Sequence, residues 1–320
     1  MSLNLRRPTK RHSKLETGLR TATLTIRGGI PKNYSCSIDM DYEARYRQAQ
    51  RPKYDCLLFD LDDTLYPLSS GMAASCCKNI ADYLVEELGI EESIVPELGN
   101  LLYKNYGTTM AGLRAIGYSF DYDDYHRLPY ENLKPDPVLR QLLQGLSIRK
   151  LVFTNADKVH ALEVLKRLGL EDCFEGIICF ETVNPPSSST PAAAGVFDIV
   201  GHFARGPSVD GVELPKTPVL CKPSPEAMEQ ALRIANIDPH RTVFFDDSAR
   251  NIQAGKRAGL HTVLVGTRHR VKGADYALES IHKMKEALPE LWEEAEVASA
   301  AAGNIRYSAG NVAMETPVTA

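Results

Sequence analysis

The sequence has no long hydrophobic run, no excess of basic residues and no regular cysteine spacing. No apolar stretch in its 320 residues approaches the roughly 20 residues that a membrane-spanning helix needs. A formal net charge of −4 is not the basic signature of a nucleic-acid-binding protein. The seven cysteines are odd in number and lack framework spacing, which argues against a secreted disulfide scaffold. We therefore expect a soluble cytoplasmic or nuclear protein with no membrane or nucleic-acid partner.

Acidic residues are scarce near the N-terminus. Residues 1–38 contain a single one, Glu16, against eight lysines or arginines. This composition is typical of a disordered basic extension, and it also resembles an organelle transit peptide. We expect residues 1–50 to be a disordered extension and leave organellar import through it open. Residues 293–320 have few large apolar side chains, so we predict a disordered tail there.

Between these ends, short apolar runs alternate with amphipathic helix patterns. The runs predict strands at 56–59, 150–153, 176–181, 242–247 and 261–266, with a possible edge strand at 275–280. Helical periodicity predicts helices at 72–88, 93–105, 108–116, 139–146, 158–170, 224–237 and 248–258. Strands that alternate with such helices predict an α/β fold, with a Rossmann-like parallel sheet and helices on both of its faces.

Two long connections interrupt this alternation. About 90 mostly helical residues separate the first two strands, which is more than a compact α/β core needs in one connection. We therefore predict an inserted helical subdomain at 67–135 and a core made of 51–66 and 136–292. The stretch 184–217 is rich in Pro, Ser and Gly and predicts a long surface loop, although its segment 196–203 (VFDIVGHF) is apolar enough to pack.

Polar side chains follow several of the predicted strands. Because the carboxyl ends of parallel strands meet at one edge of a sheet, we expect these groups to converge there. They are Asp60, Asp62, Thr64, Thr154, Asn155, Lys222, Asp246 and Asp247. Clustered carboxylates can be held together by a hard divalent cation such as Mg²⁺, and an ammonium and a hydroxyl suit phosphate oxygens. One carboxylate could attack phosphorus while another carries protons.

These residues resemble, in order, the four motifs of the haloacid dehalogenase superfamily, over about residues 54–282. The resemblance implies that Asp60 is the nucleophile and that Asp62 is the general acid/base. It also implies that the helical insertion is the cap that closes over the site in one branch of the superfamily. Dehalogenases of this fold act without a carboxylate at the position of Asp62, so dehalogenation is disfavoured.

The same resemblance implies the ligands of the phosphoryl group and the metal. Thr154, Asn155 and Lys222 would bind the phosphoryl group. The carboxylates of Asp60 and Asp246 and the backbone carbonyl of Asp62 would hold Mg²⁺, and Asp247 would reach the metal through water or lie just outside its ligands.

A finer resemblance concerns the substrate. Segments such as YGTTMAGL (106–113) and FTNADKVHALEVLKRLGLEDCFEG (153–176) look like the pyrimidine 5'-nucleotidases first met as suppressors of transcript-elongation defects, and their plant relatives. This resemblance implies hydrolysis of UMP and CMP. The candidates for recognising the base are Asn105, Thr108, Thr109 and Arg114. A phosphatase of sugar phosphates or other small phosphate esters stays open, as does a regulatory protein on an inactive hydrolase fold, and the oligomeric state is not predicted.

Other interpretations fit the residues less well. A calcium loop starting at Asp60 would need Gly at position six and Glu at position twelve, where the sequence has Leu65 and Gly71. Receiver domains share strand-end aspartates but are far shorter. No metal-ligand spacing surrounds the histidines considered, so we interpret them as surface or satisfied core residues; they are His126, His160 and His261. Cys76 and Cys77 are predicted to be buried thiols, and Tyr103, Tyr106 and Tyr118 could line a cap pocket or pack in the core.

Overall fold

The computed structural model describes residues 53–118, 130–185, 196–204 and 213–292. The chain divides into two units, Met1–Arg51 and Pro52–Ala320, and all the described residues belong to the second. The N-terminal extension, the C-terminal tail, His126 and parts of the 184–217 stretch lie outside the described residues. Within the described ranges, no helix has both the length and the apolarity needed to cross a membrane.

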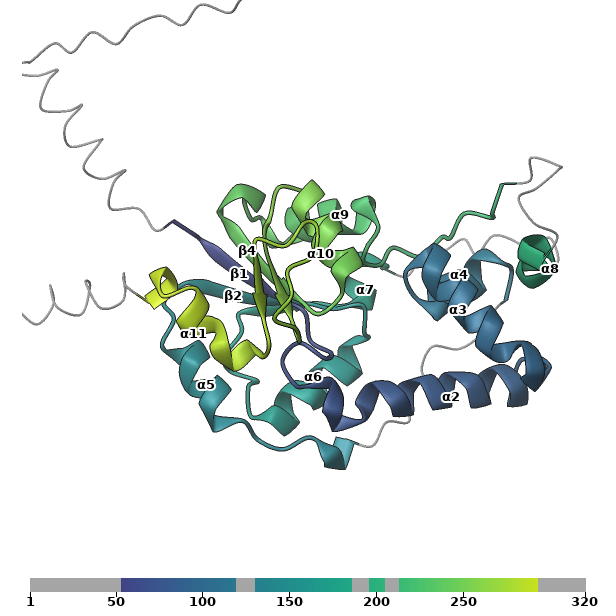
Figure 1. The fold of residues 1–320 in the computed structure, drawn as a ribbon, viewed down its shortest axis with the longest axis horizontal. Helices are drawn as coiled ribbons and strands as arrows, with labels where there is room; N and C mark the ends of the chain where they lie inside the picture. Colours follow the sequence, from purple (N-terminus) through teal and green to yellow (C-terminus); the bar gives the residue numbers. More distant parts are fainter. Residues whose placement is uncertain (1–52, 119–129, 186–195, 205–212, 293–320) are drawn as a thin grey trace, which may run out of the picture. The chain divides into compact units, whose positions relative to one another are not determined.

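Six parallel strands form one sheet in the order β3-β2-β1-β4-β5-β6 (Figure 1). The strands are β1 (Cys56–Phe59), β2 (Arg149–Phe153), β3 (Gly176–Ile178), β4 (Thr242–Asp246), β5 (His261–Val265) and β6 (Tyr276–Leu278). This is the strand order of doubly wound α/β folds, whose binding crevice lies where the order reverses. The parallel sheet is therefore confirmed, including β6 as an edge strand.

Helices cover both faces of the sheet (Figure 1). One face carries α5 (Pro137–Gln144), α6 (Lys158–Leu168) and α11 (Met284–Ala287), and the other carries α9 (Pro225–Ala235) and α10 (Ala249–Arg257). The predicted start of α9 is confirmed, because the Ser224 side chain caps the helix and Pro225 occupies its first position. The remaining short elements of the core are α7 (Phe180–Val183), η4 (Tyr130–Asn132), η5 (Pro239–Arg241) and η6 (Ile281–Lys283).

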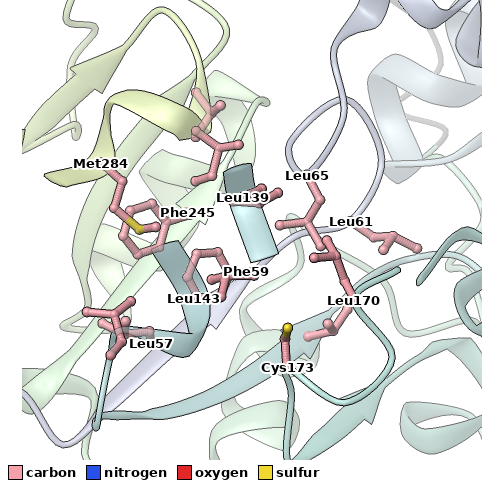
Figure 2. Close-up of a cluster of buried hydrophobic side chains, with 14 of the residues drawn as sticks. Leu57, Phe59, Leu61, Leu65, Leu139, Leu143, Leu170, Cys173, Phe245 and Met284 are labelled. Atoms are coloured by element: carbon pink, nitrogen blue, oxygen red, sulfur yellow. The ribbon is translucent and has the colours of Figure 1, made fainter. Parts of the chain in front are cut away.

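Strand β1 is buried on both faces, and its side chains alternate between two hydrophobic clusters. Leu57 and Phe59 belong to the cluster drawn in Figure 2, where Phe59 stacks on Phe245 with ring centroids 4.6 Å apart. Cys56 and Leu58 belong to the cluster on the opposite face. Each fully buried large side chain contributes about 1.5–3 kcal/mol. This burial fixes the end of β1, from which the acidic motif continues.

The insertion after β1 is helical, as predicted. It consists of η1 (Leu68–Ser70), α2 (Met72–Glu86), η2 (Glu92–Ile94), α3 (Val95–Tyr106) and α4 (Thr109–Ala115). Buried Leu84, Leu98, Leu102 and Leu113 form the centre of its own hydrophobic cluster.

The prediction of a surface loop at 184–217 is wrong at residues 199–204, which are helical, whereas the expectation that VFDIVGHF is apolar enough to pack is confirmed. Helix α8 (Ile199–Ala204) forms there, and its Ile199 is only 1% exposed within the hydrophobic cluster of the insertion. The N–H of Phe197 donates to the carbonyl of Ile116 at 2.8 Å. The helix forms despite the surrounding Pro, Ser and Gly because Ile199 is buried against the insertion and Phe197 and Val200 are partly buried there, which removes apolar surface from water. We use the term cap for the described residues 67–118 together with 196–204.

Candidate active site

Asp60 stands at the centre of the site, directly after β1. Its backbone N–H donates to the carbonyl of Phe245, which continues the ladder between β1 and β4 by one residue. The carboxylate is 6% exposed, and its Oδ2 accepts a hydrogen bond from the Thr64 hydroxyl at 3.1 Å. The strand pairing and this hydrogen bond hold the carboxylate at the carboxyl edge of the sheet.

Lys222 carries a buried positive charge at the site. Its ammonium is 1% exposed and donates three hydrogen bonds, to Asp60 Oδ1 at 2.6 Å, Asp246 Oδ2 at 2.8 Å and the Phe153 carbonyl at 2.8 Å. A buried ammonium is tolerated only with such partners. Lys222 therefore joins the ends of β1, β2 and β4, although 162 sequence positions separate it from Asp60.

Thr154 and Asn155 lie at the end of β2, on the same pocket as Asp60 and Lys222. The Asn155 side chain makes two hydrogen bonds with the backbone of Lys222. Nδ2 of Asn155 donates to the Lys222 carbonyl at 3.0 Å, and Oδ1 of Asn155 accepts from the Lys222 N–H at 2.8 Å. Thr154 is buried, and its hydroxyl accepts from the N–H of Ala156. Asn155 thus holds the lysine segment in place, and its contact with a phosphoryl group stays a prediction.

Three carboxylates could hold a metal ion. One oxygen from each of Asp60, Asp246 and Asp247 lies within 4.8 Å of the other two. Asp246 is oriented by residues that the sequence did not point to, because its Oδ1 accepts from the N–H of Ser248 and from the Asn251 amide. Hard oxygen donors at this spacing fit Mg²⁺ better than a softer transition metal.

The electrostatics of this group also favour a cation. Burial raises the pKa of Asp60 well above its ordinary value, and Lys222 opposes this shift while Asp246 and Asp247 add to it. Burial, followed by the charge of Asp246, raises the pKa of Asp247 to about 7. One ammonium therefore does not compensate the acidic cluster, and a bound divalent ion would favour its ionised form.

Asp62 points to a different set of partners from those of Asp60. Its Oδ1 accepts a hydrogen bond from the Tyr66 hydroxyl at 2.6 Å and lies 2.7 Å from Nε2 of His160. Burial raises the pKa of Asp62, but the charge and hydrogen bond of His160 outweigh it, so that the net shift is downward.

His160 is a residue of the site whose contact with Asp62 sequence reasoning missed. It is 4% exposed, so its assignment as a satisfied core residue holds, but its partner is the predicted general acid/base. The available signal was its position in the first turn of α6, which follows the Thr154-Asn155 motif and is capped by Asp157.

Two adjoining pockets open at this edge. A pocket of about 200 Å³ contains Asp60, Thr154 and Lys222, and a neighbouring one of about 320 Å³ extends under the cap. The residues common to both are Asp62, Asp63, Tyr103, Thr108 and Asn155. The larger pocket is lined mainly by apolar groups, which include Met72, Ala73, Cys76, Ile80 and Met110. An organic group attached to a phosphate in the smaller pocket could therefore extend into an apolar space.

The four cap candidates divide into two pairs. Thr108 and Thr109 line the larger pocket, and the Thr108 hydroxyl caps α4 by accepting from the N–H of Ala111. Asn105 is exposed and donates from Nδ2 to the Leu101 carbonyl on its own helix. Arg114 lies in the last turn of α4 and is not among the described residues that line either pocket.

Aromatic and thiol groups of the cap also differ in their placement. Tyr103 lines both pockets, whereas Tyr106 and Tyr118 pack on the hydrophobic cluster of the cap. Cys77 is exposed, so the prediction that it is a buried thiol is wrong. Cys76 is half-buried at the wall of the larger pocket.

Arg250 links the core to the cap at the mouth of the smaller pocket. Its guanidinium donates to the Tyr103 carbonyl at 3.0 Å and lies 4.8 Å from the centre of the Tyr103 ring. No sequence motif singled out this contact.

Comparison with known proteins gives matches over most of the described chain. Residues 54–259 match the family model of the haloacid dehalogenase-like hydrolases. Phosphate metabolism protein 8 of Saccharomyces cerevisiae is 27% identical over 255 residues, which cover 73% of this chain and 68% of that protein.

Among solved structures, a HAD phosphatase from Thermococcus onnurineus matches with a TM-score of 0.43 and 19% identity, over 72% of this chain and 96% of that one. The L-2-haloacid dehalogenase of Xanthobacter autotrophicus matches with a TM-score of 0.40 and 13% identity, over 73% of this chain and 97% of that one.

Proposed function

Because the chain belongs to the haloacid dehalogenase-like hydrolases, we propose that it is a Mg²⁺-dependent phosphomonoesterase that acts through a phosphorylated Asp60. The observation that carries the proposal is the pair of aspartates after β1. The Asp60 carboxylate is buried beside Lys222, while the Asp62 carboxylate lies on the wall shared by the two pockets. A nucleophile and a separate proton carrier are what phosphate ester hydrolysis requires.

The proposed reaction has two steps. A carboxylate oxygen of Asp60 attacks phosphorus, the bond between phosphorus and the ester oxygen breaks, and Asp62 protonates the departing alkoxide. Asp62 then takes a proton from water, which attacks phosphorus, breaks the bond to Asp60 and releases inorganic phosphate. Thr154 and Lys222 line the same pocket as Asp60 and would bind phosphoryl oxygens in both steps, with Lys222 exchanging one of its three hydrogen bonds for one to the phosphoryl group.

Mg²⁺ would be held by the carboxylates of Asp60, Asp246 and Asp247 and by the backbone carbonyl of Asp62. When bound, it would neutralise negative charge on the carboxylates and the phosphoryl group.

For the substrate we propose a nucleoside 5'-monophosphate, with UMP and CMP favoured. The support is the apolar wall of the larger pocket, formed by Met72, Ile80 and Met110 among others. A planar base can bury its faces against such a wall, whereas the hydroxyls of a sugar would lose hydrogen bonds to water there without replacing them. Thr108 and Thr109 lie at this wall, and their hydroxyls would meet the polar edge of a base.

The reaction class is tested by hydrolysis of p-nitrophenyl phosphate with Mg²⁺ and with EDTA. We expect turnover with Mg²⁺, loss with EDTA, and a fall of at least three orders of magnitude in Asp60→Asn. The matched control is Asp55→Asn, which removes a carboxylate from the opposite end of β1, where it pairs with Arg241. A near-normal rate in Asp60→Asn, or persistent inactivity of the wild-type protein on a broad phosphate panel, would refute the proposal.

The substrate is tested by kcat/KM for UMP, CMP, AMP, GMP and several sugar phosphates measured in parallel. A preference of tenfold or more for UMP and CMP over purine nucleotides supports the nucleotidase assignment. If a sugar phosphate is preferred by that margin, the nucleotide assignment is wrong and the phosphatase assignment alone remains.

A further inference from the structure

Asp62 belongs to a chain of four hydrogen-bonded side chains at the wall of the active site, Tyr130, His160, Asp62 and Tyr66. The Tyr130 hydroxyl lies 2.9 Å from Nδ1 of His160, and Nε2 of His160 lies 2.7 Å from Asp62 Oδ1. The Tyr66 hydroxyl donates to the same oxygen at 2.6 Å. Among the described residues, no donor reaches the other oxygen, Oδ2. The carboxylate is therefore held through one oxygen and has the other available to the pockets that it lines.

The position of His160 is determined by the core rather than by the cap. The residue lies in the first turn of α6, where its backbone N–H donates to Asp157 at 2.7 Å and its ring is almost fully buried. Both ring nitrogens have partners, which is the condition for burying an imidazole at low cost. The ring therefore presents Nε2 to Asp62 from a fixed point.

A fixed contact matters for proton transfer because an aspartate carboxyl group rotates broadly about its terminal torsion. A general acid contributes fully only when its oxygen lies within hydrogen-bond reach of the leaving atom. Two donors on Oδ1 that come from different segments, His160 from α6 and Tyr66 from the segment after β1, restrict that rotation.

We propose that His160 is a positioning residue for the protonation of the leaving group by Asp62. It holds Oδ1 so that Oδ2 faces the ester oxygen of the bound substrate. This inference rests on the proposed function, since it assigns a role in the step that Asp62 performs there. The histidine itself neither touches the substrate nor exchanges a proton with it.

The test depends on the leaving group. A nitrophenolate leaves readily without a proton, whereas an alkoxide needs one, so that the loss of a positioned acid affects the two unequally. We would measure kcat/KM for p-nitrophenyl phosphate and benzyl phosphate, two probes of similar size, because kcat/KM reports the steps up to cleavage of the ester bond. For His160→Ala we expect a fall of 30-fold or more on benzyl phosphate and of threefold or less on p-nitrophenyl phosphate.

Two further variants separate positioning from packing. His160→Gln keeps a side-chain N–H that can reach Asp62. Its kcat/KM on benzyl phosphate should be at least tenfold higher than that of His160→Ala. His261→Ala removes a histidine at the start of β5, at the edge of the sheet opposite the catalytic pocket, where its Nε2 lies 3.1 Å from the His240 carbonyl. It should leave the ratio of the two rates within twofold of wild type, even if it lowers the melting temperature.

The possible results distinguish the inference from the function on which it rests. Equal losses on both probes in His160→Ala, or no recovery in His160→Gln, would show a structural role only and would overturn the inference while the phosphatase assignment stands. Absence of wild-type turnover on either probe with Mg²⁺ would overturn the phosphatase assignment and the inference together. If His160→Ala does not fold, the test uses His160→Gln and the ratio of kcat/KM on benzyl phosphate to kcat/KM on p-nitrophenyl phosphate. A ratio equal to that of wild type supports the inference, and a lower ratio contradicts it.

Discussion

Replacing Lys222 by methionine should destabilise the protein more than any surface lysine substitution. The ammonium makes two charge-assisted hydrogen bonds, to Asp60 and Asp246, and a third to the Phe153 carbonyl. Each charge-assisted hydrogen bond contributes about 1.5–3 kcal/mol, and breaking a buried ion pair by removing one partner costs about 3–5 kcal/mol. We therefore expect the free energy of unfolding of Lys222→Met to fall by about 3–5 kcal/mol in the absence of divalent ions.

The assay is urea unfolding at pH 7 in EDTA, followed by circular dichroism and by the fluorescence of Trp292, the single tryptophan, which is buried in the core. The matched control is Lys150→Met. Lys150 is partly buried. Its ammonium donates to the carbonyls of Leu146 and Ile148 and, within the part of the chain that the structure describes, to no carboxylate, so its loss should cost about 1 kcal/mol.

Addition of Mg²⁺ gives a second criterion. A divalent ion can replace the missing positive charge beside Asp60 and Asp246. Mg²⁺ should therefore reduce the difference in unfolding free energy between Lys222→Met and wild type and leave the difference for Lys150→Met unchanged. The reasoning is refuted if Lys222→Met costs no more than Lys150→Met at an unchanged denaturant slope.

Three further outcomes follow from the structure. Partial burial raises the pKa of Asp275, but hydrogen bonds from Lys256 and a backbone N–H lower it overall. Asp275 therefore adds stability that is present above an unfolded-state pKa of about 3.9 and is lost as pH falls through the lower folded-state value. Asp275→Asn should cost about 1–2 kcal/mol in urea unfolding at pH 7 and less at pH 3, and an equal cost at both would contradict this. A Cβ at Gly112 would lie 2.6 Å from Leu102 Cβ, whereas one at Gly99 would meet nothing within 4 Å. Hydrogen exchange of the cap amides should therefore show that Gly112→Ala lowers the opening free energy of the cap by about 1–3 kcal/mol, whereas Gly99→Ala leaves it unchanged or raises it. Similar values for the two variants would exclude the packing argument. Finally, millimolar Mg²⁺ should raise the wild-type melting temperature by several degrees and EDTA should reverse the rise, whereas no shift would count against a metal at the acidic cluster.

The sheet was predictable because a local apolar run in the sequence marks each of its strands. An apolar run such as CLLF that ends in Asp60 identifies both a buried strand and the edge at which its polar residues gather. The convergence of Lys222 on that edge follows from the parallel topology once the strands are known. Capped helices such as α9 were equally visible, because Ser224 and Pro225 are start signals in themselves.

The remaining features depend on contacts that no local pattern records. His160 meets Asp62 across 98 positions, and its place on α6 does not reveal which residue it faces. Asn105 belongs to a suggestive segment, but in the structure its amide binds a carbonyl of its own helix. Helix α8 is short and has Pro-, Ser- and Gly-rich flanks. Only the burial of its Ile199 against the helices of residues 67–118 shows why it forms. Tertiary packing decides such cases, and a single sequence carries little information about it.

The cap consists of two separate chain segments, residues 67–118 and residues 196–204, and the second of these lies between β3 and Lys222. Ile199 is buried among the helices of the first insertion. Thr217, which lies five residues before Lys222, donates from its hydroxyl to the Ala111 carbonyl at 2.8 Å. A cap of this kind can be transferred from one enzyme to another in order to alter substrate specificity. A graft of residues 67–135 alone would expose to water the apolar residues that Ile199 covers and would leave the Ala111 carbonyl without the Thr217 hydroxyl. A functional chimera of this protein must therefore carry both segments, matched to each other, into the recipient core.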